Sequence, residues 1–80
     1  MNELIQKIEQ LHTTPLGAQR VQKNARLGET DPVAWCKEKI LQSGASFSRE
    51  GKNWYICADG WRITVNASSY TIITVHRDRG

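Results

Sequence analysis

The stretch NWYICADGWRITVN, residues 53–66, decides the fold of this chain. At its centre stands Asp59-Gly60, a dipeptide that strongly favours a two-residue hairpin turn, and apolar residues alternate with others on both sides. Such a turn pairs three apolar couples: Ala58 with Trp61, Ile56 with Ile63, and Trp54 with Val65. These six residues would share one face, which must be buried. The opposite, open face would carry Asn53, Tyr55, Cys57, Arg62, Thr64 and Asn66.

Two further strands extend the predicted sheet, a short one over 46–49 and a last one, YTIITVHR, over 70–77. The facing of the last strand depends on the loop before it. An odd-length loop puts Thr71, Ile73 and Val75 on the core side and Tyr70, Ile72, Thr74 and His76 on the open side; an even-length loop reverses this. We prefer the odd loop, because it pairs Ile63 with Ile73 and Trp61 with Val75 and keeps His76 out of the core.

Helical signals fill the chain ahead of the sheet. An apolar stripe predicts a first helix from about Asn2 to His12. Thr14-Pro15 and Asp31-Pro32 each combine an N-cap with a proline at the first helical position, so they predict the starts of two more helices. Gly28 and Gly44 are the matching candidates for the helix ends.

The predicted fold class is therefore α+β. Two or three N-terminal helices pack on one face of a C-terminal antiparallel sheet of three to four strands, because no other element can cover the apolar face. Residues 1–80 form a single compact domain, with helices over about 2–44, the sheet over about 46–77 and a frayed tail at 78–80.

Composition limits the classes of function. The 80 residues contain 11 Lys and Arg against 8 Asp and Glu, a net charge of +3, which permits nucleic-acid binding without demanding it. The sequence shows neither a membrane-spanning run nor a signal peptide, so we predict a cytoplasmic protein with no membrane partner. Cys36 and Cys57 lack the spacing of zinc ligands and are predicted to be reduced thiols. No cofactor or metal motif is present.

The open face of the sheet holds groups suited to RNA. His76 could act as general acid or base because histidine titrates near neutral pH, and Arg62 could hold a phosphate. Thr74 lies beside them, and we assign these three residues a catalytic role. Ordinary sheet polarity is the competing interpretation of the same residues. Further nucleic-acid-binding candidates on the strands are Tyr55, Asn66, Tyr70 and Arg77.

Two features of the helices complete the set of candidates. Arg20, Lys23 and Arg26 recur every three residues and form one basic stripe, which suits phosphate binding or simple solvation. Trp35, if it projects from the third helix, would be an exposed aromatic group and a contact for a protein partner.

The blocks LHTTPLGAQRVQKN, WCKEKI, GKNWY and ITVNASSYTIITVHR resemble a small bacterial family, domain of unknown function 3781, over about Leu11 to Arg77. The last block also looks like the final hairpin of the small metal-independent ribonucleases that include barnase, EndoU, the colicins and RelE. That looser resemblance implies cleavage of RNA on the sheet face away from the helices. It would make Thr74, His76, Arg62 and Arg20 or Lys23 the RNA-handling residues.

Three hypotheses for function follow. The leading one is an RNA-handling domain that uses the open sheet face, and its most specific form is a toxin-like, metal-independent endoribonuclease. The alternative is a non-catalytic interaction module or inhibitor that binds a protein partner, or pairs with a second copy through the free edge of an outer strand. The third is a nucleotide or small-anion binder that uses Arg20, Lys23 and Arg62.

Overall fold

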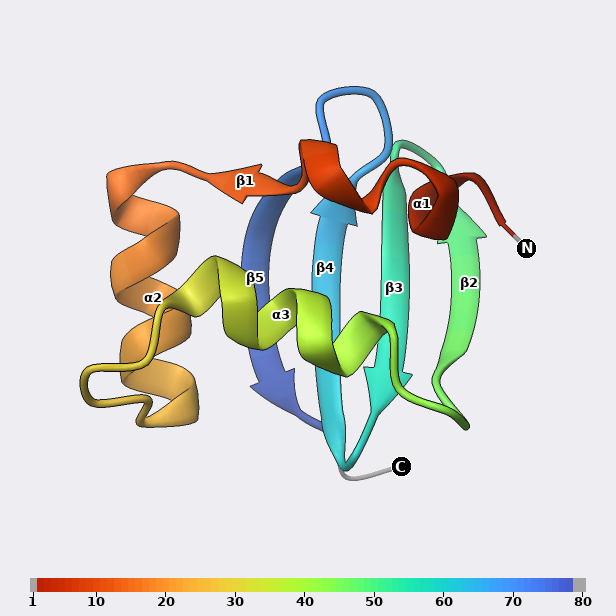
Figure 1. The fold of residues 1–80 in the computed structure, drawn as a ribbon. Helices are drawn as coiled ribbons and strands as arrows, with labels where there is room; N and C mark the ends of the chain where they lie inside the picture. Colours follow the sequence, from red (N-terminus) through yellow and green to blue (C-terminus); the bar gives the residue numbers. More distant parts are fainter. Residues whose placement is uncertain (1, 79–80) are drawn as a thin grey trace.

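The computed structural model of the protein describes residues 2–78, with the predicted hairpin, β3 (Asn53–Ala58) and β4 (Trp61–Asn66), near its centre. With β1 (His12–Thr13), β2 (Ser46–Glu50) and β5 (Thr71–Arg77) it forms a five-stranded sheet of order β1-β5-β4-β3-β2 (Figure 1). The helical elements are α1 (Glu3–Gln6), the 3-10 helix η1 (Ile8–Gln10), α2 (Pro15–Ala25) and α3 (Pro32–Ile40). The fold is α+β, with the helices ahead of the four main strands.

The central hairpin has the predicted register. Ala58 pairs with Trp61, Ile56 with Ile63, and Trp54 with Val65. Asp59 and Gly60 have φ values of 53° and 78°, and positive φ at both turn positions is what a type I′ turn requires. The dipeptide therefore sets both the turn and the faces of the two strands.

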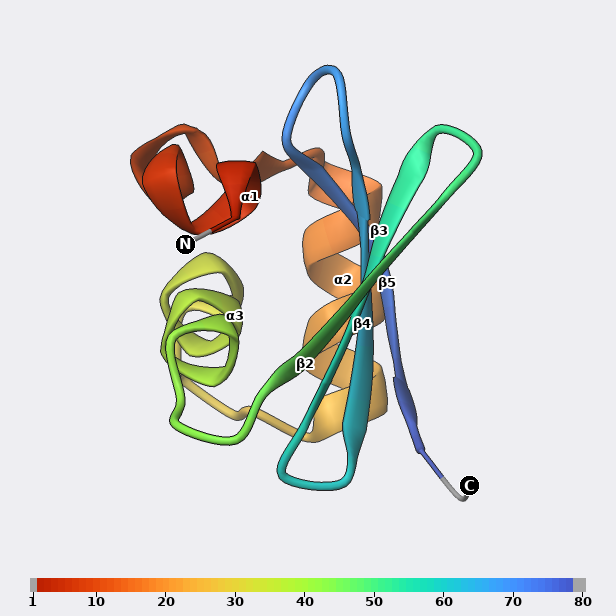
Figure 2. The same ribbon diagram turned by 90° about the vertical axis from the view of Figure 1, so that its right-hand side faces the viewer.

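The apolar face of the sheet forms the core. Ile56, Ile63, Val65 and Val75 have no exposed surface, and α1 and α3 cover them (Figure 2). Trp54 and Trp61 are only partly buried and pack at the margin of this core. Each fully buried aliphatic side chain contributes about 1.5–3 kcal/mol of transfer free energy, so this face supplies most of the drive for folding.

Helix α2 departs from the predicted arrangement, because it lies beside the β5 edge rather than over the face of the sheet (Figures 1 and 2). Two side chains bind the outer backbone of β5: Thr13 Oγ1 donates to Ile72 O at 3.0 Å, and Asn24 Nδ2 donates to Val75 O at 2.8 Å. Gly17 allows the close approach, since a Cβ there would lie 2.2 Å from Thr13 Oγ1. One edge of the sheet is thus covered by a helix.

The first predicted helix is wrong beyond its first turn. The helix α1 ends at Gln6, a 3-10 turn follows, and His12 and Thr13 form β1, which pairs in parallel with Thr71 and Ile72. Leu4 and Leu11 are both buried, at 0% and 4% exposure, and the break in the helix lets both reach the core. The sheet is therefore mixed and has five strands, where three or four antiparallel strands were predicted.

A β-bulge decides the facing of β5. Ile63 pairs with Val75 rather than Ile73, and after Thr64 opposite Thr74 the register shifts so that Val65 pairs with Ile72. The C-terminal half of β5 therefore has the facing of the odd loop, with Val75 inside. The N-terminal half has the opposite facing, which corrects the prediction that Thr71 and Ile73 lie on the core side: Ile72 is 1% exposed and Tyr70 is 5% exposed.

The ends of the predicted elements also shift. The helix α2 ends at Ala25, with Arg26 as its left-handed cap, and α3 ends at Ile40, so neither reaches the predicted glycine. Asp78 is held by a 2.8 Å bond from its N–H to Gly60 O, which contradicts fraying at that residue. The remainder of the predicted tail, residues 79–80, lies outside the described part of the chain.

Burial of Cys36 should lower the free energy of unfolding at alkaline pH. Burial, and secondarily the charge of Asp31, raise the pKa of the Cys36 thiol from 9.0 to about 12. Above pH 9 the unfolded thiol ionises while the folded thiol stays protonated, so stability present below pH 9 is lost as the pH rises toward 12. We expect the free energy of unfolding to fall by about 1.4 kcal/mol more per pH unit over this range because of Cys36. Urea titrations at pH 8 and 10 test this, with Cys36→Ala expected to lose the added dependence; an equal slope in both proteins would contradict it.

Candidate nucleic-acid interface

The uncovered face of the sheet carries two rows of side chains, because residues directly opposite in antiparallel strands project to the same side. One row crosses β2 to β5 through Ser46, Cys57, Arg62 and His76. The next row holds Ser48, Tyr55, Thr64 and Thr74. No helix lies on this side of the sheet between residues 2 and 78 (Figure 2). Arg62 and His76 are therefore neighbours on a face that is open to solvent.

Arg62 and Tyr55 are in contact on this open face. The Arg62 guanidinium lies 4.7 Å from the centroid of the Tyr55 ring, a cation–π distance, and Arg62 remains exposed. Thr64, which pairs with Tyr55, is only 8% exposed, so neighbouring side chains cover the middle of the face. The result is an arginine–tyrosine platform, one guanidinium over one phenol ring, with His76 opposite Arg62 on the neighbouring strand.

Cys57 stands beside Arg62 in the same row, yet its thiol is not activated. Hydrogen bonding to the Asp78 side chain, followed by partial burial and the Asp78 charge, raises the pKa of Cys57, and Arg62 only partly opposes this. The thiol therefore stays protonated at neutral pH. A protonated thiol is a poor nucleophile, so Cys57 adds no nucleophilic chemistry to the row.

Three predicted site residues have other roles or positions. Tyr70 is not on the open face: it is buried, and its hydroxyl donates to Glu3 Oε1 at 3.0 Å. The Asn66 side chain is engaged in the β4–β5 turn, where Oδ1 accepts from the N–H groups of Ser68 and Ser69 at 3.0 Å each. Arg77 lies against Trp61, 4.8 Å from its ring, on the side of the sheet that faces the helices.

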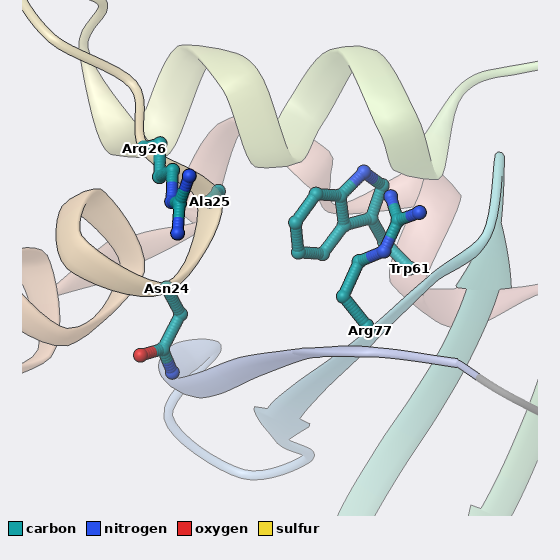
Figure 3. A pocket seen from close by; sticks show the side chains of 5 residues that line it. All are labelled: Asn24, Ala25, Arg26, Trp61 and Arg77. Carbon is teal, nitrogen blue, oxygen red and sulfur yellow. The ribbon is translucent and has the colours of Figure 1, made fainter.

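The basic stripe of α2 is divided between two places. Arg20 and Lys23 are exposed on α2, the helix that lies beside the β5 edge and not on the open face of the sheet (Figure 1). Arg26 and Arg77 instead line one pocket with Asn24, Ala25 and Trp61, with Arg26 and Asn24 on one side and Trp61 and Arg77 on the other (Figure 3). The sequence pointed to both arginines, but no local pattern places the end of α2 against the ends of β4 and β5.

Trp35 is packed rather than freely exposed. Its ring meets Trp61 edge to face, with centroids 5.4 Å apart, and Lys39 Nζ lies 5.6 Å from the Trp35 centroid. Trp35 is therefore only half-buried, which corrects the picture of an aromatic group projecting into solvent. Within residues 2–78 the exposed large apolar side chains are Leu16 and Leu41, at 64% and 54% exposure, and no sequence pattern pointed to either of them as a contact.

Between residues 2 and 78, no group of three or more His, Cys, Asp and Glu side chains could hold a metal ion. The helices in that range are all too short or too polar to cross a bilayer.

The fold and these clusters define a small α+β domain with an arginine–tyrosine platform on an open sheet and a pair of arginines at one end. The chain belongs to the family described as protein of unknown function (DUF3781), whose model matches residues 5–76. Neither the search of curated proteins nor that of solved structures found a match. The family is therefore established, whereas the resemblance to small ribonucleases stays a prediction.

Proposed function

We propose that this domain binds single-stranded RNA on the open face of its sheet. The observation that carries the proposal is the Arg62 guanidinium stacked on Tyr55, directly opposite His76 in the register. An unpaired base can stack on an arginine plane, and the same guanidinium can donate to a neighbouring phosphate. An open sheet face with an arginine–aromatic pair suits splayed single-stranded bases better than a duplex, which is recognised mostly by shape and backbone.

The expected affinity is modest. The net charge of the chain is +3, and the row on the open face offers one arginine and one histidine to phosphate. Binding that relies on a few phosphate contacts has dissociation constants of about 10⁻⁴ to 10⁻⁶ M at physiological salt. We therefore expect low-micromolar or weaker binding that decreases with salt concentration.

The geometry favours binding over cleavage. Metal-independent cleavage needs a group to accept the 2′-hydroxyl proton and a group to protonate the leaving oxygen. His76 can supply one of these roles, but the other histidine, His12, pairs with Thr71, five residues away along β5. Five residues of strand span about 16 Å, which is too far for both rings to act on one phosphate. We therefore propose RNA binding as the main function and treat RNA cleavage through His76 as a more specific hypothesis.

Arginine variants test the proposal by fluorescence anisotropy with a labelled single-stranded RNA. Arg62→Ala is expected to weaken binding about tenfold, the cost of losing a charged hydrogen bond, and to lower the salt slope by about one. Arg49→Ala is the matched control. Arg49 also lies over an aromatic ring, 5.8 Å from the centroid of Trp54, but its register places it on the face of the sheet that the helices cover. It should leave the affinity unchanged.

The same samples decide between the competing functions. Equal weakening by Arg49→Ala and Arg62→Ala would overturn a specific site on the open face. RNA that is cut in the presence of EDTA by the native protein and left intact by His76→Ala would establish the endoribonuclease. If RNA does not bind, the interaction module becomes the better hypothesis, and the observation that favours it is the outer edge of β2, which pairs with no other strand in the described chain.

A further inference from the structure

We propose a second binding site, independent of the RNA face, in which the pocket between α2 and the ends of β4 and β5 takes a small phosphate monoester. The pocket has a volume of about 360 Å³ and is lined by Asn24, Ala25, Arg26, Trp61 and Arg77 (Figure 3). That volume lies at the lower end of the range for small-molecule sites, about 300–1,000 Å³. It leaves room for an organic group beside the phosphate.

The charges at the pocket favour an anion. Arg26 and Arg77 enter its lining from two different elements, and no carboxylate belongs to the described lining. Two carboxylates near Arg77 are engaged elsewhere. Asp59 feels the charge of Arg77, but Lys39 Nζ binds Asp59 Oδ2 at 2.7 Å, and the side chain of the adjacent Asp78 hydrogen-bonds with Cys57. The ion pairs described between residues 2 and 78, Lys7–Glu3 and Lys39–Asp59, involve neither arginine. Two guanidinium forks are suited to bidentate recognition of phosphate oxygens.

Trp61 gives the pocket an apolar wall. Its ring is held from two directions, by the edge-to-face contact with Trp35 and by Arg77 at 4.8 Å. The indole is thereby fixed in place, and a fixed aromatic surface can pack against the organic part of a ligand at little entropic cost. Asn24 fixes the other side, because its amide donates to Val75 O at 2.8 Å. The lining therefore needs little rearrangement to accept a ligand.

The backbone at Arg26 supports a binding role for its side chain. Arg26 caps α2 in the left-handed conformation, with φ of 52°, a position where glycine is the usual residue. A side chain at such a position costs stability, and residues held there often serve function. If Arg26 only capped the helix end, its replacement by glycine would relieve this strain at no loss of function. The strained backbone therefore supports a function for the Arg26 side chain, and that side chain lines the pocket.

Adenosine 5′-monophosphate, inorganic phosphate and adenosine are the probes, and the NMR signal of the Trp61 indole N–H reports binding. We expect adenosine 5′-monophosphate to shift that signal, inorganic phosphate to shift it at higher concentration, and adenosine to have no effect. Arg77→Ala should weaken monophosphate binding about tenfold or more. Arg26→Gly should do the same while raising Tm by about 4 °C, since it removes the left-handed strain.

Arg20→Ala is the matched control, because Arg20 is exposed on α2 outside the pocket lining. It removes one positive charge and should leave binding unchanged. Equal weakening by this variant would overturn the proposal by showing a general charge effect. So would an unshifted Trp61 signal at millimolar monophosphate. Arg62→Ala should bind the monophosphate normally, so the failure of the RNA proposal and that of the pocket remain distinguishable.

Discussion

Replacing Gly17 by alanine is expected to lower the free energy of unfolding by about 2–4 kcal/mol, although glycine to alanine within a helix normally stabilises by about 1 kcal/mol. The added Cβ would lie 2.2 Å from Thr13 Oγ1 and 3.1 Å from Ile72 O. Thr13 can turn away only by giving up its 3.0 Å bond to that same carbonyl. The backbone oxygen cannot turn away, so α2 would have to move off the β5 edge.

Urea denaturation measures this effect, and a double-mutant cycle identifies its cause. Thr13→Ala alone should cost about 1 kcal/mol, the value of one hydrogen bond. The double variant Gly17→Ala, Thr13→Ala should be less destabilised than the sum of the two single variants, because removing the threonine oxygen removes the shorter contact. A stabilised Gly17→Ala protein would show that α2 does not approach β5 as closely as described.

Local signals account for the parts of the fold that the sequence predicted. The two Thr/Asp-Pro starts are confirmed: Thr14 Oγ1 accepts from Gly17 N at 3.0 Å, and Asp31 Oδ2 accepts from Ala34 N at 2.8 Å. The turn at Asp59-Gly60 is equally local. Strict alternation on either side of that turn then fixes which residues lie on the buried face. The position of Arg62 on the open face follows from these short-range rules alone.

The parts that sequence reasoning missed all depend on contacts between distant segments. A two-residue parallel strand such as β1 is too short to show a period. It depends on bonds to a distant segment, among them those from His12 N to Tyr70 O at 3.1 Å and from Thr13 Oγ1 to Ile72 O at 3.0 Å. The bulge in β5 adds one residue. The facing expected from an odd loop is therefore right for the C-terminal half of the strand, and the facing expected from an even loop is right for the N-terminal half. No window of sequence contains the information that chooses between them.

The candidate sites divide in the same way. Alternation places His76 on the same face as Arg62, because the C-terminal half of β5 has the predicted facing. The predicted register was wrong, since it put Thr74 opposite Arg62, where the structure has His76. The pocket could not be predicted, since it requires the end of α2 to meet Trp61 and Arg77, which are more than 30 residues further along the chain. The sequence marked Arg26 and Arg77 as separate phosphate-binding candidates, and only the tertiary structure brings them into one pocket.

Tyr70→Ala is expected to lower the free energy of unfolding by about 3 kcal/mol, the usual cost of truncating a buried aromatic residue. Tyr70 is 5% exposed and belongs to the core that also contains Leu4 and Leu11. Its ring lies 6.0 Å from Lys7 Nζ, and its hydroxyl donates to Glu3, so it holds the N-terminal segment on the sheet. Because an 80-residue domain has a total free energy of unfolding of roughly 4–12 kcal/mol, this single change removes a large part of it.

Tyr70→Phe separates packing from the hydrogen bond and should cost only about 1 kcal/mol, because the ring stays in place and only the bond to Glu3 is lost. Urea denaturation of both variants measures the two losses. RNA affinity of folded Tyr70→Phe should equal that of the native protein, since the hydroxyl faces α1 and not the open face. A tenfold loss of RNA affinity with unchanged stability would instead assign Tyr70 to the nucleic-acid interface, because a residue whose role is packing affects binding only through the folded fraction.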